Sequence, residues 1–157
     1  MSDDGFNQLK EETEEYYGSI DHIKCSALNN ASIHFTSEGL NHLKYSKKKP
    51  RTKEVQANKF KLLKKGVALL EKTTTIQEYS ERTELVVKKK HKKLVKEWLP
   101  VGYWGFIGII GGTRVKVVVK RVDNSKYMFW SVIPTWQTKE IQGHRITDRS
   151  NGDLAQD

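Results

Sequence analysis

The sequence predicts an α+β domain in which N-terminal helices pack on a roughly four-stranded antiparallel sheet. Three observations lead to this prediction. Apolar residues recur at helical spacing between positions 52 and 70. Residues 102–136 hold three β-branched or aromatic runs, separated by Gly111-Gly112 and then by residues 123–126, which is typical of consecutive antiparallel strands. The helical patterns precede this meander in the chain, as in the α+β class.

Length and composition favour one domain that works inside the cell. The 157 residues divide into an acidic N-terminal segment (1–30), a single α+β domain (31–137) and a tail (138–157) that we expect to be poorly ordered. The single cysteine, Cys25, excludes an intramolecular disulfide. No apolar run approaches the roughly 20 residues that span a bilayer, and the N-terminus does not resemble a signal peptide. We therefore expect a cytoplasmic protein without membrane contact.

The positive charge is concentrated in the middle of the chain. The formal net charge is +9, but residues 1–30 carry −5 and residues 44–96 carry +13. A polycation of this size favours an anionic partner, and nucleic acid is the commonest one. The alternative is a lysine-rich surface that only keeps the protein soluble.

The first half of the chain predicts short helices around one short strand. Residues 6–17 form an acidic helix that Gly18 ends. Residues 33–35 read as a strand, and Thr36 or Ser37 caps one or two helical turns over 38–43. His34, His42 and Lys44 fall in this region. A basic loop over 46–51 follows and includes Arg51.

The helix over 52–70 is the clearest in the chain, because its apolar stripe and its lysines occupy different faces. We assign Lys59 to the exposed lysine face. Residues 73–87 alternate as one or two edge strands, and residues 88–93 (KKKHKK) form a cationic hairpin tip or loop.

The middle strand of the predicted meander alternates between apolar and cationic side chains. Its valines share one face: Val115, Val117 and Val119. Its cations share the other: Arg114, Lys116 and Lys120. In the third strand, the same alternation predicts that Ser131 shares a face with Phe129, opposite Trp130.

The catalytic chemistry compatible with these residues is narrow. The sequence has no P-loop, dinucleotide fingerprint or Gly-x-Ser-x-Gly elbow, and its scattered acids predict no metal site and no cofactor. Histidine, lysine and arginine remain, and these groups cleave RNA without a metal. A base takes the ribose 2′-hydroxyl proton, that oxygen attacks phosphorus, an acid protonates the leaving 5′-oxygen, and cations stabilise the transition state.

Four segments together resemble the phage-type Barnase/EndoU/colicin/RelE-like (BECR) nucleases. They are residues 34–43 (HFTSEGLNHL), 60–63 (FKLL), 103–106 (YWGF) and 129–134 (FWSVIP), and the resemblance spans about residues 31–137. It implies N-terminal helices on a four-stranded antiparallel sheet and metal-independent RNA cleavage. It also implies a site built from an early histidine or lysine and polar sheet residues, often with a hydroxyl on the last strand.

The resemblance implies a role for several residues of this chain. The general base is His42, with His34 as second choice, and the last-strand hydroxyl is Ser131. The stabilising cation is Lys116 or Arg114. The meander lacks a second histidine, so the general acid is Lys44 or a lysine of the sheet.

Several residues are expected to contact nucleic acid: Arg51, Lys88, Lys89, Lys90, Arg114, Lys120, Trp104 and Trp130. Each also has a structural interpretation, since strand tryptophans usually belong to the core and His42 beside leucines is often structural. We predict a toxin- or mobile-element-type endoribonuclease acting on tRNA or single-stranded RNA. The alternatives are a non-catalytic RNA- or DNA-binding module and a protein that docks an acidic antitoxin or inhibitor.

Overall fold

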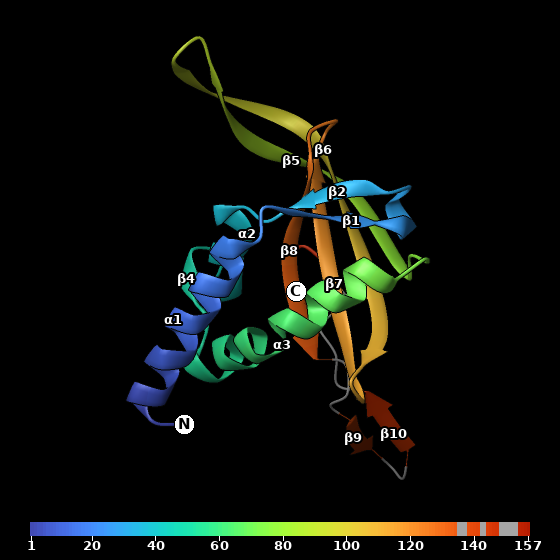
Figure 1. Cartoon of the computed structure of the whole chain (residues 1–157). Coiled ribbons are helices and arrows are strands. Elements are labelled where there is room, and N and C mark those ends of the chain that lie inside the picture. Colours follow the sequence, from blue (N-terminus) through green and yellow to red (C-terminus); the bar gives the residue numbers. More distant parts are fainter. Residues whose placement is uncertain (135–137, 142–143, 148–153) are drawn as a thin grey trace.

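The computed structural model of the chain describes residues 1–134 and 154–157 in full and residues 138–141 and 144–147 as backbone. The predicted α+β class is confirmed in these residues (Figure 1). The helices of the described residues are α1 (Asp3–Ser19), α2 (Ser37–Lys44) and α3 (Lys53–Lys72), and η1 (Ser26–Leu28) is a 3-10 turn. The main sheet contains β1 (His22–Cys25), β2 (Ala31–His34), β5 (Glu78–Lys90), β6 (Lys93–Ile110), β7 (Thr113–Val122) and β8 (Tyr127–Pro134). Two short pairings are β3 (Tyr45–Ser46) with β4 (Lys49–Pro50) and β9 (Thr138–Ile141) with β10 (His144–Thr147).

The prediction of a four-stranded antiparallel sheet is wrong in the number of strands and in the direction of one strand pairing. The sheet has six strands in the order β1-β2-β8-β7-β6-β5, and it is mixed because β2 runs parallel to β8. The meander β6-β7-β8 and the edge strand β5 are antiparallel, as predicted. Strand β2 overlaps the strand predicted over residues 33–35, whereas β1 was not predicted. Both lie between α1 and α2 in the chain, so the helices do not all precede the sheet.

Each helix begins at a capping hydroxyl. The side chains of Ser2, Thr36 and Thr52 accept hydrogen bonds from backbone N–H groups three residues later, at the starts of α1, α2 and α3. Such caps satisfy donors that have no partner within the helix. Thr36, one of the two predicted caps, is therefore the one that starts α2.

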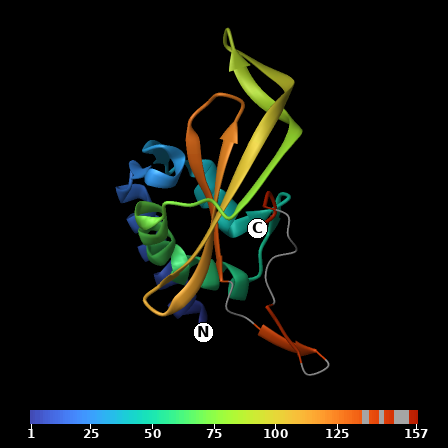
Figure 2. The same cartoon turned by 90° about the vertical axis from the view of Figure 1, so that its right-hand side faces the viewer.

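The core lies between α3 and one face of the sheet. The predicted apolar valines of β7 face this core with Phe106 and Phe129, and α1 packs on α3. Gly66 lets α3 approach closely, because a Cβ there would lie 3.0 Å from Val132 and 3.1 Å from Val117. Figure 2 shows α3 on one side of the sheet and the C-terminal residues on the other.

A β-bulge in β8 corrects the predicted alternation of the last strand. Val118 pairs with Ser131 whereas Val119 pairs with Phe129, so Trp130 is an extra residue. Phe129 stays on the core face, and Ser131 moves to the face of Val118. The hydroxyl therefore lies on the cationic face of the sheet, which simple alternation does not give.

Strands β5 and β6 extend beyond the sheet as a two-stranded arm (Figure 1), which we define as residues 84–99. Its tip is the turn at His91 and Lys92, both at positive φ, as in a two-residue hairpin. The predicted cationic hairpin tip is confirmed. Large apolar side chains of the arm are exposed: Leu85, Val87, Leu94 and Trp98.

Candidate functional site

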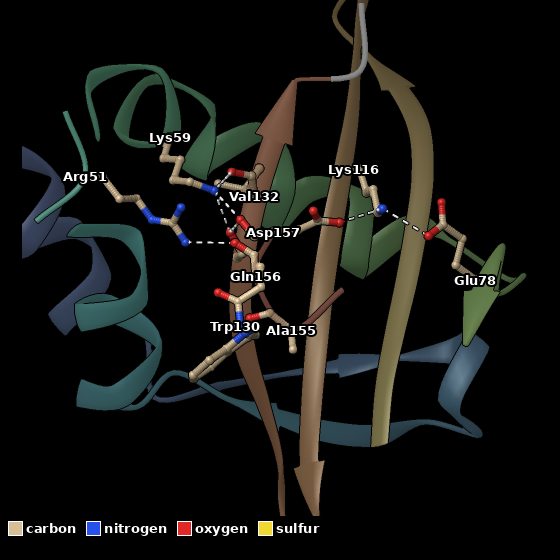
Figure 3. Close-up of polar contacts among 10 residues, drawn as sticks. Arg51, Lys59, Glu78, Lys116, Trp130, Val132, Ala155, Gln156 and Asp157 are labelled. Atoms are coloured by element: carbon tan, nitrogen blue, oxygen red, sulfur yellow. Dashed lines mark hydrogen bonds and ion pairs between the residues drawn. The ribbon is translucent and has the colours of Figure 1, made fainter. Parts of the chain in front are cut away.

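Two buried lysines, one from α3 and one from β7, reach the same residue near the C-terminal end of the sequence (Figure 3). Lys59 is 2% exposed and Lys116 is 0% exposed. The Lys59 Nζ donates to the main-chain oxygen of Asp157 at 2.6 Å, and the Lys116 Nζ lies 2.9 Å from Asp157 Oδ2. A second carboxylate, Glu78 of β5, lies 3.0 Å from the same ammonium. Two ammonium groups thus hold one anionic residue in a buried position.

Ser131 links these groups. Its Oγ accepts a hydrogen bond from Lys59 Nζ at 2.8 Å and donates one to the main-chain oxygen of Asp157 at 2.7 Å. The bulge at Trp130 turns this hydroxyl toward Lys59 and Asp157. A serine hydroxyl and two lysine side chains therefore contact two oxygens of the same residue, Asp157.

Burial makes Lys59 an unusual lysine. Removal from water and the nearby Arg51 guanidinium lower its pKa well below the ordinary lysine value, and Asp157 opposes this shift in part. A lysine in such surroundings gives up its proton more readily than an exposed one. It is therefore suited to accept a proton from an alcohol.

His42 is held by Arg51 and by Trp130. The Nη2 of Arg51 donates to His42 Nε2 at 3.1 Å, and its Nε donates to the His42 main-chain oxygen at 2.9 Å. Burial, with the charges of Arg51, Lys59 and Lys120, lowers the pKa of His42 to about 2. Because arginine only donates, His42 is neutral and its accepting nitrogen is already occupied.

The Trp130 ring is engaged by several neighbours. The His42 ring stacks on it with centroids 4.1 Å apart, and Lys120 Nζ lies 4.0 Å from its centroid. Its Nε1 donates to the main-chain oxygen of Ala155 at 3.0 Å. Burial lowers the pKa of Lys120. These contacts fix the orientation of the Trp130 ring.

An open groove of about 590 Å³ adjoins these residues on the side of α2. Its cationic and aromatic lining includes Lys47, Lys48, Lys120, His42, Tyr45, Tyr103 and Trp130. Glu38 and Glu84 also line it, and Ala155 and Gln156 form part of its wall. The groove reaches the site at His42, Trp130 and residues 155–156, and its lining includes neither Lys59 nor Lys116.

Six of the predicted residues lie together at this site: His42, Arg51, Lys116, Lys120, Trp130 and Ser131. Other predicted catalytic residues have different surroundings. His34 lies in β2, with its ring centroid 5.6 Å from that of His22. Lys44 forms an ion pair with Glu14 of α1, with Nζ and Oε1 2.7 Å apart. Arg114 is exposed near the start of β7, paired with Ile109.

Trp104 and residues 88–90 also lie apart from the buried lysines. Trp104 packs against the main core and contacts Tyr79 and Tyr127, each with ring centroids 5.1 Å apart. Residues 88–90 lie near the tip of the arm. The predicted nucleic-acid contacts therefore fall into a group at the site and a group on the arm, with Arg114 and Trp104 outside both.

Two residues of the site were not identified from the sequence. Assigning Lys59 to the exposed lysine face was wrong. Leu62, Leu63 and Gly66 follow it at helical spacing and are buried, which is the signal that places it on the packed face. Asp157 belongs to the segment that we expected to be poorly ordered, yet Leu154, Ala155 and Asp157 are buried.

Among the residues that the structure describes, no three His, Cys, Asp or Glu side chains are placed to hold a metal ion. The described helices also include none with the length and apolar character to cross a membrane. No protein family, no curated protein and no solved structure matches this chain.

Proposed function

We propose that the chain is a metal-independent endoribonuclease that cleaves RNA by attack of the ribose 2′-hydroxyl. The observation that carries this proposal is the convergence of Lys59, Lys116 and Ser131 on one anionic residue. The Lys116 ammonium supplies the positive charge that a transferring phosphoryl group requires, the neutral amine of Lys59 supplies a base, and the hydroxyl supplies a hydrogen bond. A scissile phosphate takes the place of Asp157 in the active state.

The geometry suggests how the roles are divided. Lys59, with its lowered pKa, takes the 2′-hydroxyl proton while that oxygen bonds to phosphorus. Lys116 stabilises the charge on the phosphoryl oxygens and gives a proton to the 5′-oxygen as its bond to phosphorus breaks. The products are a 2′,3′-cyclic phosphate and a 5′-hydroxyl. His42 is a positioning residue, because its accepting nitrogen binds Arg51.

The groove and the arm support an RNA substrate. Lys47, Lys48 and Lys120 line the groove and suit further phosphates of a strand whose scissile phosphate lies at the lysines. The arm carries lysines at positions 88, 89, 90, 92, 93 and 96. Cations in both places favour a substrate of several nucleotides over a mononucleotide.

The test is incubation with total tRNA and with a single-stranded RNA in EDTA, followed by analysis of the product ends. Cleavage that leaves 2′,3′-cyclic phosphate in the chelator is expected. The substitutions Lys59→Met and Lys116→Met should each lower the rate by at least about 100-fold, since each removes a proton-transfer or charge-stabilising group. Lys61→Met is the matched control, because Lys61 is an exposed lysine of the same helix.

The pH dependence separates Lys59 from His42 as the base. With Lys59 as base, the rate rises with pH until its lowered pKa is passed, and Lys59→Met removes this rise. Full activity of Lys59→Met with an unchanged profile would refute the assignment.

A non-catalytic RNA- or DNA-binding module is the second candidate. The cationic arm favours it, because the arm lies apart from the buried lysines and its own lysines suit contacts to phosphates that involve no chemistry. In the same assay, RNA that stays intact while it is bound would support this candidate.

A further inference from the structure

The site that we propose for the scissile phosphate is filled by the chain's own residues 154–157. Ser131 and Lys59 donate to the main-chain oxygen of Asp157, and Lys116 pairs with its carboxylate (Figure 3). Arg51 Nη2 donates to the main-chain oxygen of Gln156 at 3.2 Å. The segment therefore presents its oxygens to the cations that the proposed mechanism assigns to RNA.

The arrangement of these oxygens resembles that of a phosphate. One oxygen of Asp157 takes two donors, and a second, charged oxygen of the same residue takes an ammonium. A phosphodiester likewise offers two non-bridging oxygens that share one negative charge. Asp157 thus satisfies, within the chain, the groups that would otherwise bind the phosphate.

Apolar contacts also hold residues 154–157 in place. Leu154 packs in a small apolar cluster with Val101, Tyr103 and Val118, on the face of the sheet opposite α3. Gly105 leaves room for it, since a Cβ there would lie 3.3 Å from Leu154 Cδ2 and 3.5 Å from Lys116 Cε. Ala155 lies in the same cluster, and the main-chain oxygens of residues 155–157 accept hydrogen bonds from neighbouring side chains. A polyanion that also reaches Lys47 and Lys48 of the groove has further cations to contact.

We propose that residues 154–157 are an autoinhibitory segment that competes with RNA phosphate for Lys59, Lys116 and Ser131. This inference rests on the proposed function, because it concerns the regulation of the same site. With the segment docked, the lysines are almost fully covered and the chemistry cannot begin. RNA binding then requires that the segment leave.

The first experiment measures the affinity for a labelled 2′-O-methyl RNA oligonucleotide by fluorescence anisotropy. This probe lacks the attacking hydroxyl, so its binding is separate from cleavage. If the segment closes the site nine-tenths of the time, deletion of residues 154–157 lowers the apparent Kd about tenfold. The substitution Asp157→Asn should act in the same direction and more weakly, because it keeps the main-chain contacts.

The control is Asp123→Asn, which removes the same charge from an exposed turn between β7 and β8. It should change the Kd less than twofold. Tighter binding by Asp123→Asn equal to that of Asp157→Asn would overturn the proposal, because net charge alone would then explain the effect. Unchanged or weaker binding by a folded deletion variant would also overturn it, as would no binding by either chain.

The second experiment uses the intact protein, so it does not depend on how the variants fold. Amide resonances of residues 154–157 are followed by NMR while the oligonucleotide is added. Movement of these resonances to random-coil positions is expected as the oligonucleotide binds. Binding that leaves them at their folded positions refutes the inference, even if the protein cleaves RNA. Release of the segment without any cleavage of unmodified RNA supports the inference and refutes the proposed catalysis.

Discussion

The buried, uncharged state of His42 predicts that the stability of the protein falls as the pH is lowered from 7 to 5. In the unfolded chain the histidine takes up a proton near its ordinary pKa of 6.5, whereas in the folded protein its pKa is about 2. The unfolded state therefore binds more protons between these two values, and the free energy of unfolding rises with pH in that window. The stabilisation is complete above pH 6.5 and is lost as the pH falls toward 2.

The magnitude follows from the two pKa values. Linkage gives a loss of about 2 kcal/mol between pH 7 and pH 5, and this result hardly changes if the folded value is one unit higher. His42→Gln removes the titrating group. The drop in the free energy of unfolding from pH 7 to pH 5 should therefore be about 2 kcal/mol smaller in this variant than in the wild type.

The assay is urea-induced unfolding followed by far-UV circular dichroism at both pH values. The control is His91→Gln, at the exposed tip of the arm, which should keep the wild-type drop. A His42→Gln drop within about 0.5 kcal/mol of the wild-type drop would refute the reasoning. In that case His42 would titrate nearly as in the unfolded chain, and the role of general base would return to it.

Three further predictions concern other parts of the chain. Gly39→Ala should destabilise the protein by about 2–4 kcal/mol in urea unfolding, because the new Cβ would overlap the Phe129 carbonyl oxygen. The control is Gly18→Ala, which should not destabilise the protein, since a Cβ at Gly18 would have no atom within 4 Å. Equal effects of the two substitutions would show that α2 is not tightly docked on β8. Replacing residues 88–90 with glutamate should weaken RNA binding and make the slope of log K against log salt shallower by about 2; an unchanged slope would remove the arm from the interface. The Cys25 thiol is buried and its pKa is raised by burial, so it should react with a thiol reagent only after unfolding, and rapid reaction of the folded protein would contradict this.

Hydrophobic periodicity in the sequence predicted the helices and strands that are long enough to show it. The helix over 52–70 and the meander over 102–136 were predicted because their periodicity continues over many residues. Strands β1 and β2 have four residues each, and β2 is fixed by pairing with the distant β8. No short-range signal reports such a pairing.

The site was predicted in part for the same reason. Lys116 and Lys120 follow from alternation along β7, and Ser131 was implied as the last-strand hydroxyl by the resemblance to the BECR nucleases. The face of the sheet on which Ser131 lies depends on the β-bulge at Trp130, and the residue pattern does not predict that bulge. The contact with Asp157 joins residues far apart in the chain, and a lysine is normally assigned to the surface unless its partner is known.

The parallel pairing of β2 with β8 also has a consequence for the order in which the protein forms during synthesis. Ile33 is paired with Tyr127, so the N-terminal strands can complete the sheet only after the last strand has left the ribosome. Contacts between such distant residues form late, because the intervening chain must be closed into a loop first. Ser131 belongs to that last strand, and Asp157 follows it. A nascent chain therefore lacks the assembled lysine–serine cluster until β8 has been synthesised and has joined the sheet.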